Sequence, residues 1–93
     1  MARVYRELVK VQTGEDGLPA WFGWRRRRYT VRAVHEYWLV NRDWWRESRP
    51  VPARPELEYW RVEASAGRGQ SAGIYELRRD VAADAWTLQA VED

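Results

Sequence analysis

The sequence predicts an all-β domain, a small antiparallel meander, curled sheet or SH3-like barrel of five to six strands with at most one short helix. Three observations favour this fold class. The 93 residues are typical of a single domain, residues 1–93. Short segments rich in β-branched and aromatic residues alternate with turn-forming residues. The last three segments follow one another closely, which favours antiparallel neighbours. Closure would protect strand edges, and an OB-like barrel is the alternative.

The expected strands cover residues 4–11, 20–25, 28–40, 57–64, 74–79 and 86–91. For the first segment, a short helix over residues 5–11 is the alternative. The second and third strands are joined by a tight reversal at Arg26 and Arg27, although arginine is unfavourable in a two-residue hairpin turn. The long third strand must bend or contain a bulge, which we expect in its C-terminal half.

Period-two alternation assigns one face of each strand to the core. In the third strand the solvent face includes Arg28, Arg32 and Trp38, and in the second strand Trp21 faces away from Phe22 and Trp24. The predicted inward residues are Phe22, Trp24, Tyr29, Val31, Ala33, His35, Tyr37, Leu39, Trp60, Val62, Ala64, Tyr75, Leu77, Trp86, Leu88 and Ala90.

The segment between the third and fourth strands is predicted to lack strands. Residues 41–47 form one helical turn in this interpretation. Residues 48–56 contain Pro50, Pro52 and Pro55, which exclude a central strand and favour a long extended loop within the single domain.

Composition limits the chemistry available to the chain. There is no cysteine, so neither disulfides nor thiolate chemistry is possible. The N-terminal residues are charged and resemble no signal peptide, and no apolar run reaches the ~18 residues that span a bilayer. We therefore expect a cytoplasmic protein that does not contact a membrane.

Charge is distributed unevenly along the chain. Residues 1–54 carry 12 basic and 6 acidic groups, whereas residues 55–93 carry 4 basic and 8 acidic groups. Such asymmetry indicates either an anionic partner for the first half or charge pairing between strands. Five of the seven tryptophans and five clustered arginines fall within residues 21–45.

This arginine- and tryptophan-rich stretch is the first candidate site. Outward basic side chains interleaved with flat aromatic rings are typical of surfaces that bind single-stranded nucleic acid. The predicted contacts are Arg25, Arg28 and Arg32 for phosphate, with Trp21 and Trp38 as stacking surfaces. The alternative is structural, with the arginines lying over packed tryptophans and their stems covering apolar surface.

A second candidate site is a protein interface at Trp44 and Trp45, next to the proline-rich loop. Tryptophan is enriched at interface hot spots, so this segment predicts binding to another protein or to a second copy of the chain, as a homodimer. The alternative is that the loop folds back over these side chains.

The sequence offers no constellation that supports an enzyme, a cofactor or a metal site. His35 is the only histidine and falls on the apolar face, which favours a core histidine over a ligand. Residues 67–73 are glycine-rich but lack the Lys-Ser/Thr of a phosphate loop, so they predict a hairpin loop. We therefore expect a non-enzymatic binding domain.

Six segments carry a resemblance to a known family: FGWRRRRYTVRAV, HEYW, WW, YWRVEA, GIYELRRD and AWTLQAVED. Over residues 21–93 the chain resembles a bacterial family of small, uncharacterised, tryptophan-rich proteins. Genes of that family often lie beside an inactive-type Y-family DNA polymerase and its error-prone partner. The resemblance implies a role near DNA-damage tolerance, with a repair polymerase as a possible partner, and it supplies no catalytic residues. The chain departs from the pattern at Arg26, where glycine would suit the reversal.

Overall fold

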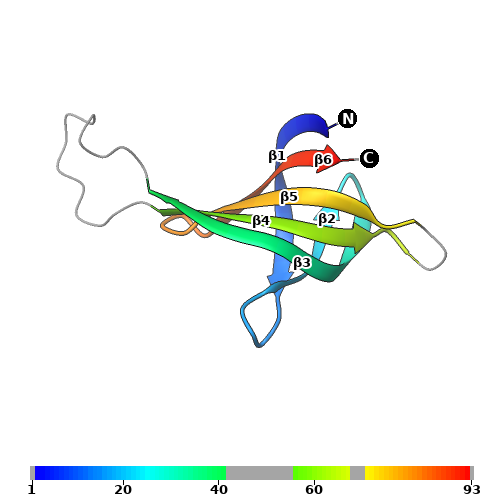
Figure 1. Cartoon of the computed structure of the whole chain (residues 1–93), viewed down its shortest axis with the longest axis horizontal. Coiled ribbons are helices and arrows are strands. Elements are labelled where there is room, and N and C mark those ends of the chain that lie inside the picture. The colour runs from blue at the N-terminus through cyan, green and yellow to red at the C-terminus, as the bar shows by residue number, and fades with distance from the viewer. Residues whose placement is uncertain (1, 42–55, 68–70, 93) are drawn as a thin grey trace.

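The computed structural model describes residues 2–41, 56–67 and 71–92, and these form a closed six-stranded antiparallel barrel (Figure 1). The strands follow one another around the barrel in sequence order. They are β1 (Ala2–Thr13), β2 (Pro19–Trp24), β3 (Arg27–Asn41), β4 (Glu56–Ser65), β5 (Gly73–Asp80) and β6 (Ala85–Glu92). This confirms the prediction of an all-β barrel, and the described part of the chain contains no helix.

Strand β1 closes the barrel because it pairs both with β2, the next strand in the chain, and with β6, the last one. Its first part pairs with β6, from Ala2 opposite Glu92 to Val9 opposite Trp86. Its last part pairs with β2, beginning with Lys10 opposite Gly23. The helical alternative for this segment is therefore wrong, since both edges of the strand are needed to join the two ends of the sheet.

The core is built mainly from the predicted inward residues. Phe22 stacks on Tyr29 with 5.1 Å between ring centroids and meets Tyr75 edge to face at 5.4 Å. The remaining buried hydrophobic side chains are Trp60, Val62, Ala64, Leu77, Trp86 and Leu88. Large rings fill a small barrel efficiently, since each aromatic side chain buries roughly 150–250 Å².

Two bulges in β3 change which side chains face inward between Val31 and Glu36, and this corrects the simple alternation predicted for that part of the strand. The register against β4 shifts between Val31 and Ala33 and again between Val34 and Glu36. Each bulge adds one residue to β3 and so moves the next side chain to the other face. Val34 therefore packs against the core, whereas Ala33 and His35 are exposed. The bulges lie near the middle of the strand.

His35 was predicted to be a core histidine, and this prediction is wrong. Its imidazole Nε2 lies 3.3 Å from Oε1 of Glu63 on the outer surface. A third bulge corrects the prediction for Ala90. The register of β6 against β5 shifts between Leu88 and Ala90, so Val91 packs against the core in place of Ala90.

The buried position of Leu77 generates a stability prediction. Its side chain is 0% exposed at the centre of the core. Leu77→Ala should lower the free energy of unfolding by about 2–5 kcal/mol, because it leaves a cavity that the rigid barrel cannot fill. Urea unfolding followed by tryptophan fluorescence measures the change. The matched control is Leu8→Ala at a side chain that is 80% exposed, which should change stability by less than about 0.5 kcal/mol.

Candidate nucleic-acid interface

The β2–β3 hairpin turns through two arginines in an unusual backbone conformation. The last cross-strand pair is Trp24 with Arg27, so the turn consists of Arg25 and Arg26, one residue earlier than predicted. Both residues have positive φ, at 50° and 65°. A type I′ hairpin requires this conformation, and Asn-Gly or Gly-Gly normally supplies it. An arginine in the left-handed region costs roughly 1–2 kcal/mol.

The strain at Arg25 is offset by contacts beneath the turn. Its guanidinium donates to the Glu7 carboxylate from Nη2 at 3.0 Å and from Nε at 3.4 Å. It also lies 4.7 Å from the ring centroid of Trp24 and 4.8 Å from that of Tyr5. The indole Nε1 of Trp24 donates to the same Glu7 carboxylate at 3.0 Å. These contacts anchor the base of the hairpin to β1.

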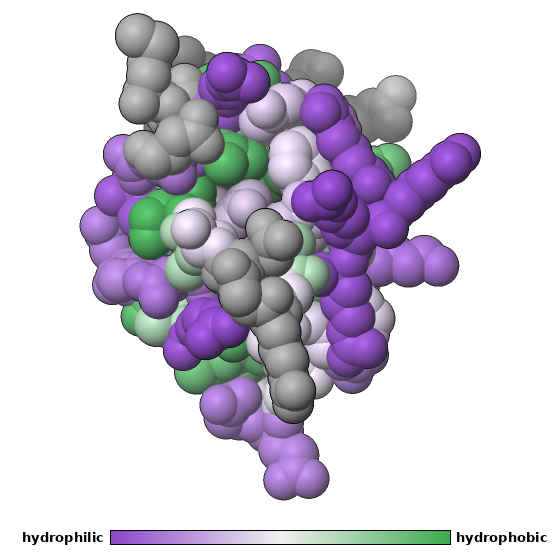
Figure 2. Space-filling model, turned by 90° about the vertical axis from the view of Figure 1, so that its right-hand side faces the viewer, coloured by the Kyte–Doolittle hydropathy of each residue, from purple (hydrophilic) through white to green (hydrophobic). Residues whose placement is uncertain are grey.

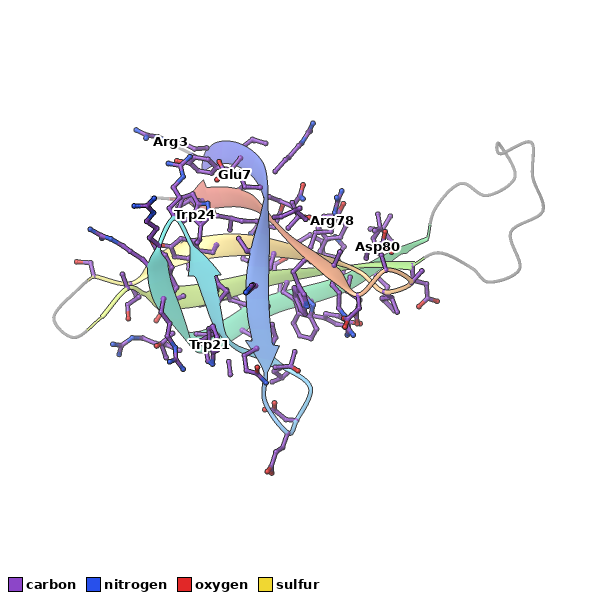
Figure 3. All side chains as sticks on the ribbon, turned by 180° about the vertical axis from the view of Figure 1, so that it is seen from behind. Arg3, Glu7, Trp21, Trp24, Arg78 and Asp80 are labelled. Carbon is purple, nitrogen blue, oxygen red and sulfur yellow. The ribbon has the colours of Figure 1, made fainter. Side chains whose placement is uncertain are left out.

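The electrostatics of this anchor follow from its hydrogen bonds. The hydrogen bond from Arg25, and to a smaller extent the one from Trp24, stabilises the ionised carboxylate and holds the pKa of Glu7 below its ordinary value. The hydrogen bond to Glu7 likewise raises the pKa of Arg25. Arg6, beside Glu7, has φ of 55° at the point where β1 shifts register against β6. The β1 bulge thus aims Glu7 at the hairpin. Figure 3 shows Glu7 beside Trp24 at one end of the barrel.

A shallow basic hollow lies on the outer face next to the turn. Lys10, Gly23 and Arg28 are directly opposite one another on β1, β2 and β3, and the missing side chain at Gly23 leaves the floor open. The hollow has a volume of about 540 Å³, and its lining includes Lys10 and Arg25, Arg26, Arg27 and Arg28. Figure 2, which views the molecule from the right-hand side of Figure 1, shows long hydrophilic side chains projecting outward along one flank.

Little in the described chain neutralises these charges. Glu7 is the only acidic residue among those that line the hollow, and its carboxylate is already paired with Arg25. Within residues 2–41, 56–67 and 71–92, Lys10, Arg26 and Arg27 form no ion pair. The hollow therefore presents a local excess of positive charge in an otherwise mixed surface.

Trp21 lies on the outer face, as predicted, next to this hollow. It pairs with Thr30 on β3, and the Arg28 guanidinium lies 4.2 Å from the centroid of its ring. The ring is half-buried, so one aromatic surface supports a cation and part of the indole remains accessible. The structural alternative predicted that arginines lie over packed tryptophans, and the position of Arg28 over Trp21 agrees with it in part.

Arg32 and Trp38 lie apart from the hairpin. Arg32 donates from Nε to the Ser65 hydroxyl at 2.9 Å. Trp38 stacks on Tyr59, with ring planes 5° apart and centroids at 5.3 Å. At ~3.3 Å per residue, the stretch of β3 from Thr30 to Trp38 spans roughly 25 Å. The five predicted nucleic-acid contacts therefore do not form one continuous surface.

Sequence reasoning missed Lys10 and Gly23 as members of the site. Lys10 joins the site through the β1–β2 register and Gly23 through its pairing with Arg28 on β3. Alternation within a single strand does not reveal such cross-strand registers. The second predicted site, Trp44 and Trp45 with the proline-rich loop, lies outside the described residues, as does most of the predicted helical turn. In the described ranges there is no group of three acidic or histidine side chains suited to a metal ion, and no helix able to cross a membrane.

The Glu7 anchor generates a pH prediction. Because the pKa of Glu7 is lowered, the ion pair should stabilise the hairpin above about pH 4.5 and lose this effect as pH falls through the folded-state pKa. In a carboxyl-resolved NMR titration, Arg25→Gln should raise the pKa of Glu7 toward its ordinary value. Arg26→Gln is the matched control and should leave it unchanged. An unaltered Glu7 pKa in Arg25→Gln would contradict the anchor.

Comparison with known proteins identifies the family and nothing finer. No curated protein and no solved structure matches the chain. A family model, a domain of unknown function designated DUF6504, matches residues 1–93 and thus includes the first 20 residues, which the sequence resemblance left out. The chain therefore belongs to the DUF6504 family of uncharacterised domains.

Proposed function

We propose that this domain is a non-enzymatic binding module that holds single-stranded nucleic acid on its hairpin surface, defined here as Lys10, Trp21, Gly23 and Arg25 to Arg28. The two-arginine turn carries the proposal. Arg26 adopts a left-handed backbone conformation that glycine would adopt without strain. Backbone strain of this kind concentrates at functional sites. Since Arg26 forms no ion pair in the described chain, presentation of its charge to an anionic ligand accounts for its presence.

The chemistry of the hairpin surface suits a nucleic-acid strand. Guanidinium groups around the Gly23 floor match phosphate oxygens in a bidentate geometry, and the open floor permits close approach of the backbone. Arg28 is already positioned over Trp21, so an incoming base can stack on the indole or on the guanidinium plane. An aromatic surface next to phosphate-binding groups favours an unpaired strand, because the bases of a duplex are already stacked.

We further propose that the domain acts beside a DNA-damage-tolerance polymerase. The sequence resemblance supports this part, since the genes of the family it resembles often neighbour such polymerases. A polymerase that copies damaged templates works on single-stranded DNA, which is the class of ligand argued from the hairpin surface.

Arg26→Gly separates binding from folding. It should leave the free energy of unfolding unchanged or raise it by up to about 1 kcal/mol, because glycine relieves the left-handed strain. It should also weaken binding of a fluorescein-labelled oligothymidylate several-fold, and lower the slope of log K against log salt by about 0.7. Fluorescence anisotropy over a salt series measures affinity, and urea unfolding measures stability.

The control for Arg26→Gly is Arg61→Gln, which removes one positive charge from the outer face of β4, where Arg61 pairs with Glu36. It should leave oligonucleotide affinity nearly unchanged. If the wild-type protein binds no oligonucleotide at about 50 mM salt, where phosphate contacts are strong, the proposal is wrong. Equal weakening by both variants would indicate a general charge effect and would also contradict it.

Gly23→Val tests the hollow itself. A Cβ at Gly23 would meet only the backbone carbonyl oxygen of Arg27, at 4.0 Å, so a side chain fits without a clash. Valine favours strands and should keep or slightly raise stability. It should weaken oligonucleotide binding by filling the floor between Lys10 and Arg28. Unchanged affinity, measured by the same anisotropy titration, would exclude the hollow as the phosphate site.

A further inference from the structure

Strand β3 has one edge without a strand partner over most of its length. Strand β2 pairs with it only from Arg27 to Thr30, because β2 is short. Beyond Thr30, β3 pairs with β4 alone. Figure 1 shows this part of β3 as the lower border of a ribbon that it forms with β4 and β5. Backbone N–H and C=O groups on this border have no strand partner in the described chain, so they are available for strand addition.

The other free edge of the barrel is protected, and the contrast is informative. In β1, residues 3–8 pair with β6 only, but this stretch contains a register shift. It also carries Arg3, Arg6 and Glu7, with Arg6 at positive φ. Bulges and charges are the usual means by which proteins prevent edge-to-edge pairing. The first part of the β3 edge is likewise interrupted by its two bulges.

Residues 36–41 lack these protective features. They pair with β4 in an unbroken register, from Glu36 opposite Arg61 to Asn41 opposite Glu56. The stretch contains a single charged residue, Glu36. It also contains three large side chains that are well exposed, Tyr37 at 45%, Leu39 at 52% and Val40 at 39%. A regular, apolar and open edge is the form that pairs most readily with another strand.

Two faces of this edge are defined by the register. Tyr37 lies on the inner side of the ribbon, with its ring 4.3 Å from that of Trp60 and its hydroxyl donating to Glu58 at 2.6 Å. Leu39 shares this side by alternation. Trp38 lies on the outer side against Tyr59, and Glu36 and Val40 share that side.

We propose that the β3 edge over residues 36–40 pairs antiparallel with the same edge of a second copy of this chain, about a two-fold axis at Trp38. This register is self-complementary. It sets Trp38 opposite Trp38 of the second copy on the outer side, with Glu36 opposite Val40. On the inner side it sets Tyr37 opposite Leu39, an aromatic–aliphatic pair made twice. No like charges oppose each other, and the edge hydrogen bonds of both copies are satisfied.

The proposed interface is small, so the dimer should depend on concentration. A few paired residues bury less surface than the 1,200–2,000 Å² typical of stable complexes. Sedimentation equilibrium of the full chain should therefore show a reversible monomer–dimer equilibrium in the range of about 1 µM to 1 mM. Amide hydrogen exchange within residues 36–40 should slow as protein concentration rises.

Charge substitutions at Trp38 test the register, because this residue faces itself. Trp38→Lys and Trp38→Glu should each be monomeric, since each opposes like charges across the axis. An equimolar mixture of the two should restore a dimer. Leu8→Lys is the matched control, a charge placed at an exposed apolar side chain on β1, and it should dimerise like the wild type.

A second pair of variants leaves the Trp38–Tyr59 stack intact. Val40→Glu would oppose Glu36 of the second copy and should raise the dimer dissociation constant at least ten-fold. Val40→Lys would oppose the same Glu36 with the opposite charge and should retain the dimer. A wild-type protein that stays monomeric at about 1 mM overturns the proposal. A dimer that is unaffected by the Trp38 and Val40 substitutions overturns it too, because the interface then lies elsewhere. The assay contains no nucleic acid, so its outcome is independent of the proposed binding function.

Discussion

The rest of the structure depends on the pairing of β1 with two partners. One part of this strand bonds to β6 and the other to β2, which turns an open meander into a barrel. Closure buries Phe22, Leu77 and Leu88 completely, and so allows a chain of 93 residues to hold a core. The same strand carries Glu7 to the hairpin and Lys10 to the basic hollow. A single strand therefore closes the barrel around the core and contributes two charged residues to the candidate site.

The hairpin combines an unfavourable backbone with favourable side-chain contacts. Arg25 and Arg26 share the left-handed conformation, but only Arg25 is compensated, by Glu7 and two aromatic rings. The ion pair with Glu7 and the cation–π contacts with Tyr5 and Trp24 therefore offset part of the cost of the left-handed backbone at Arg25. Arg26 has no such compensation in the described chain. Because of this difference, we assign Arg25 to the support of the fold and Arg26 to the proposed binding of a ligand.

The two proposed surfaces lie in different parts of the molecule and rest on different physical features. The hairpin surface is basic and is built where β1, β2 and β3 are paired. The open edge of β3 is apolar and lies where β2 has already ended. Strand β3 contributes to both surfaces, one near each of its ends. Pairing of two copies through residues 36–40 would therefore leave the hairpin surface of each copy accessible. Binding of nucleic acid and self-association are therefore compatible in one assembly.

Residue patterns alone determined the all-β class, six strands, most of the core and the outward direction of Trp21, because alternation is a local property of a strand. They also determined that a reversal occurs close to Arg26. Only the tertiary structure decided the positions of the bulges, which expose Ala33 and His35 and exchange Ala90 for Val91. It also decided that Lys10 joins Arg28 across Gly23, whereas Trp38 lies far from Trp21. The physical reason is that register, bulges and closure are properties of a pair of strands, and the alternation within one strand does not encode them.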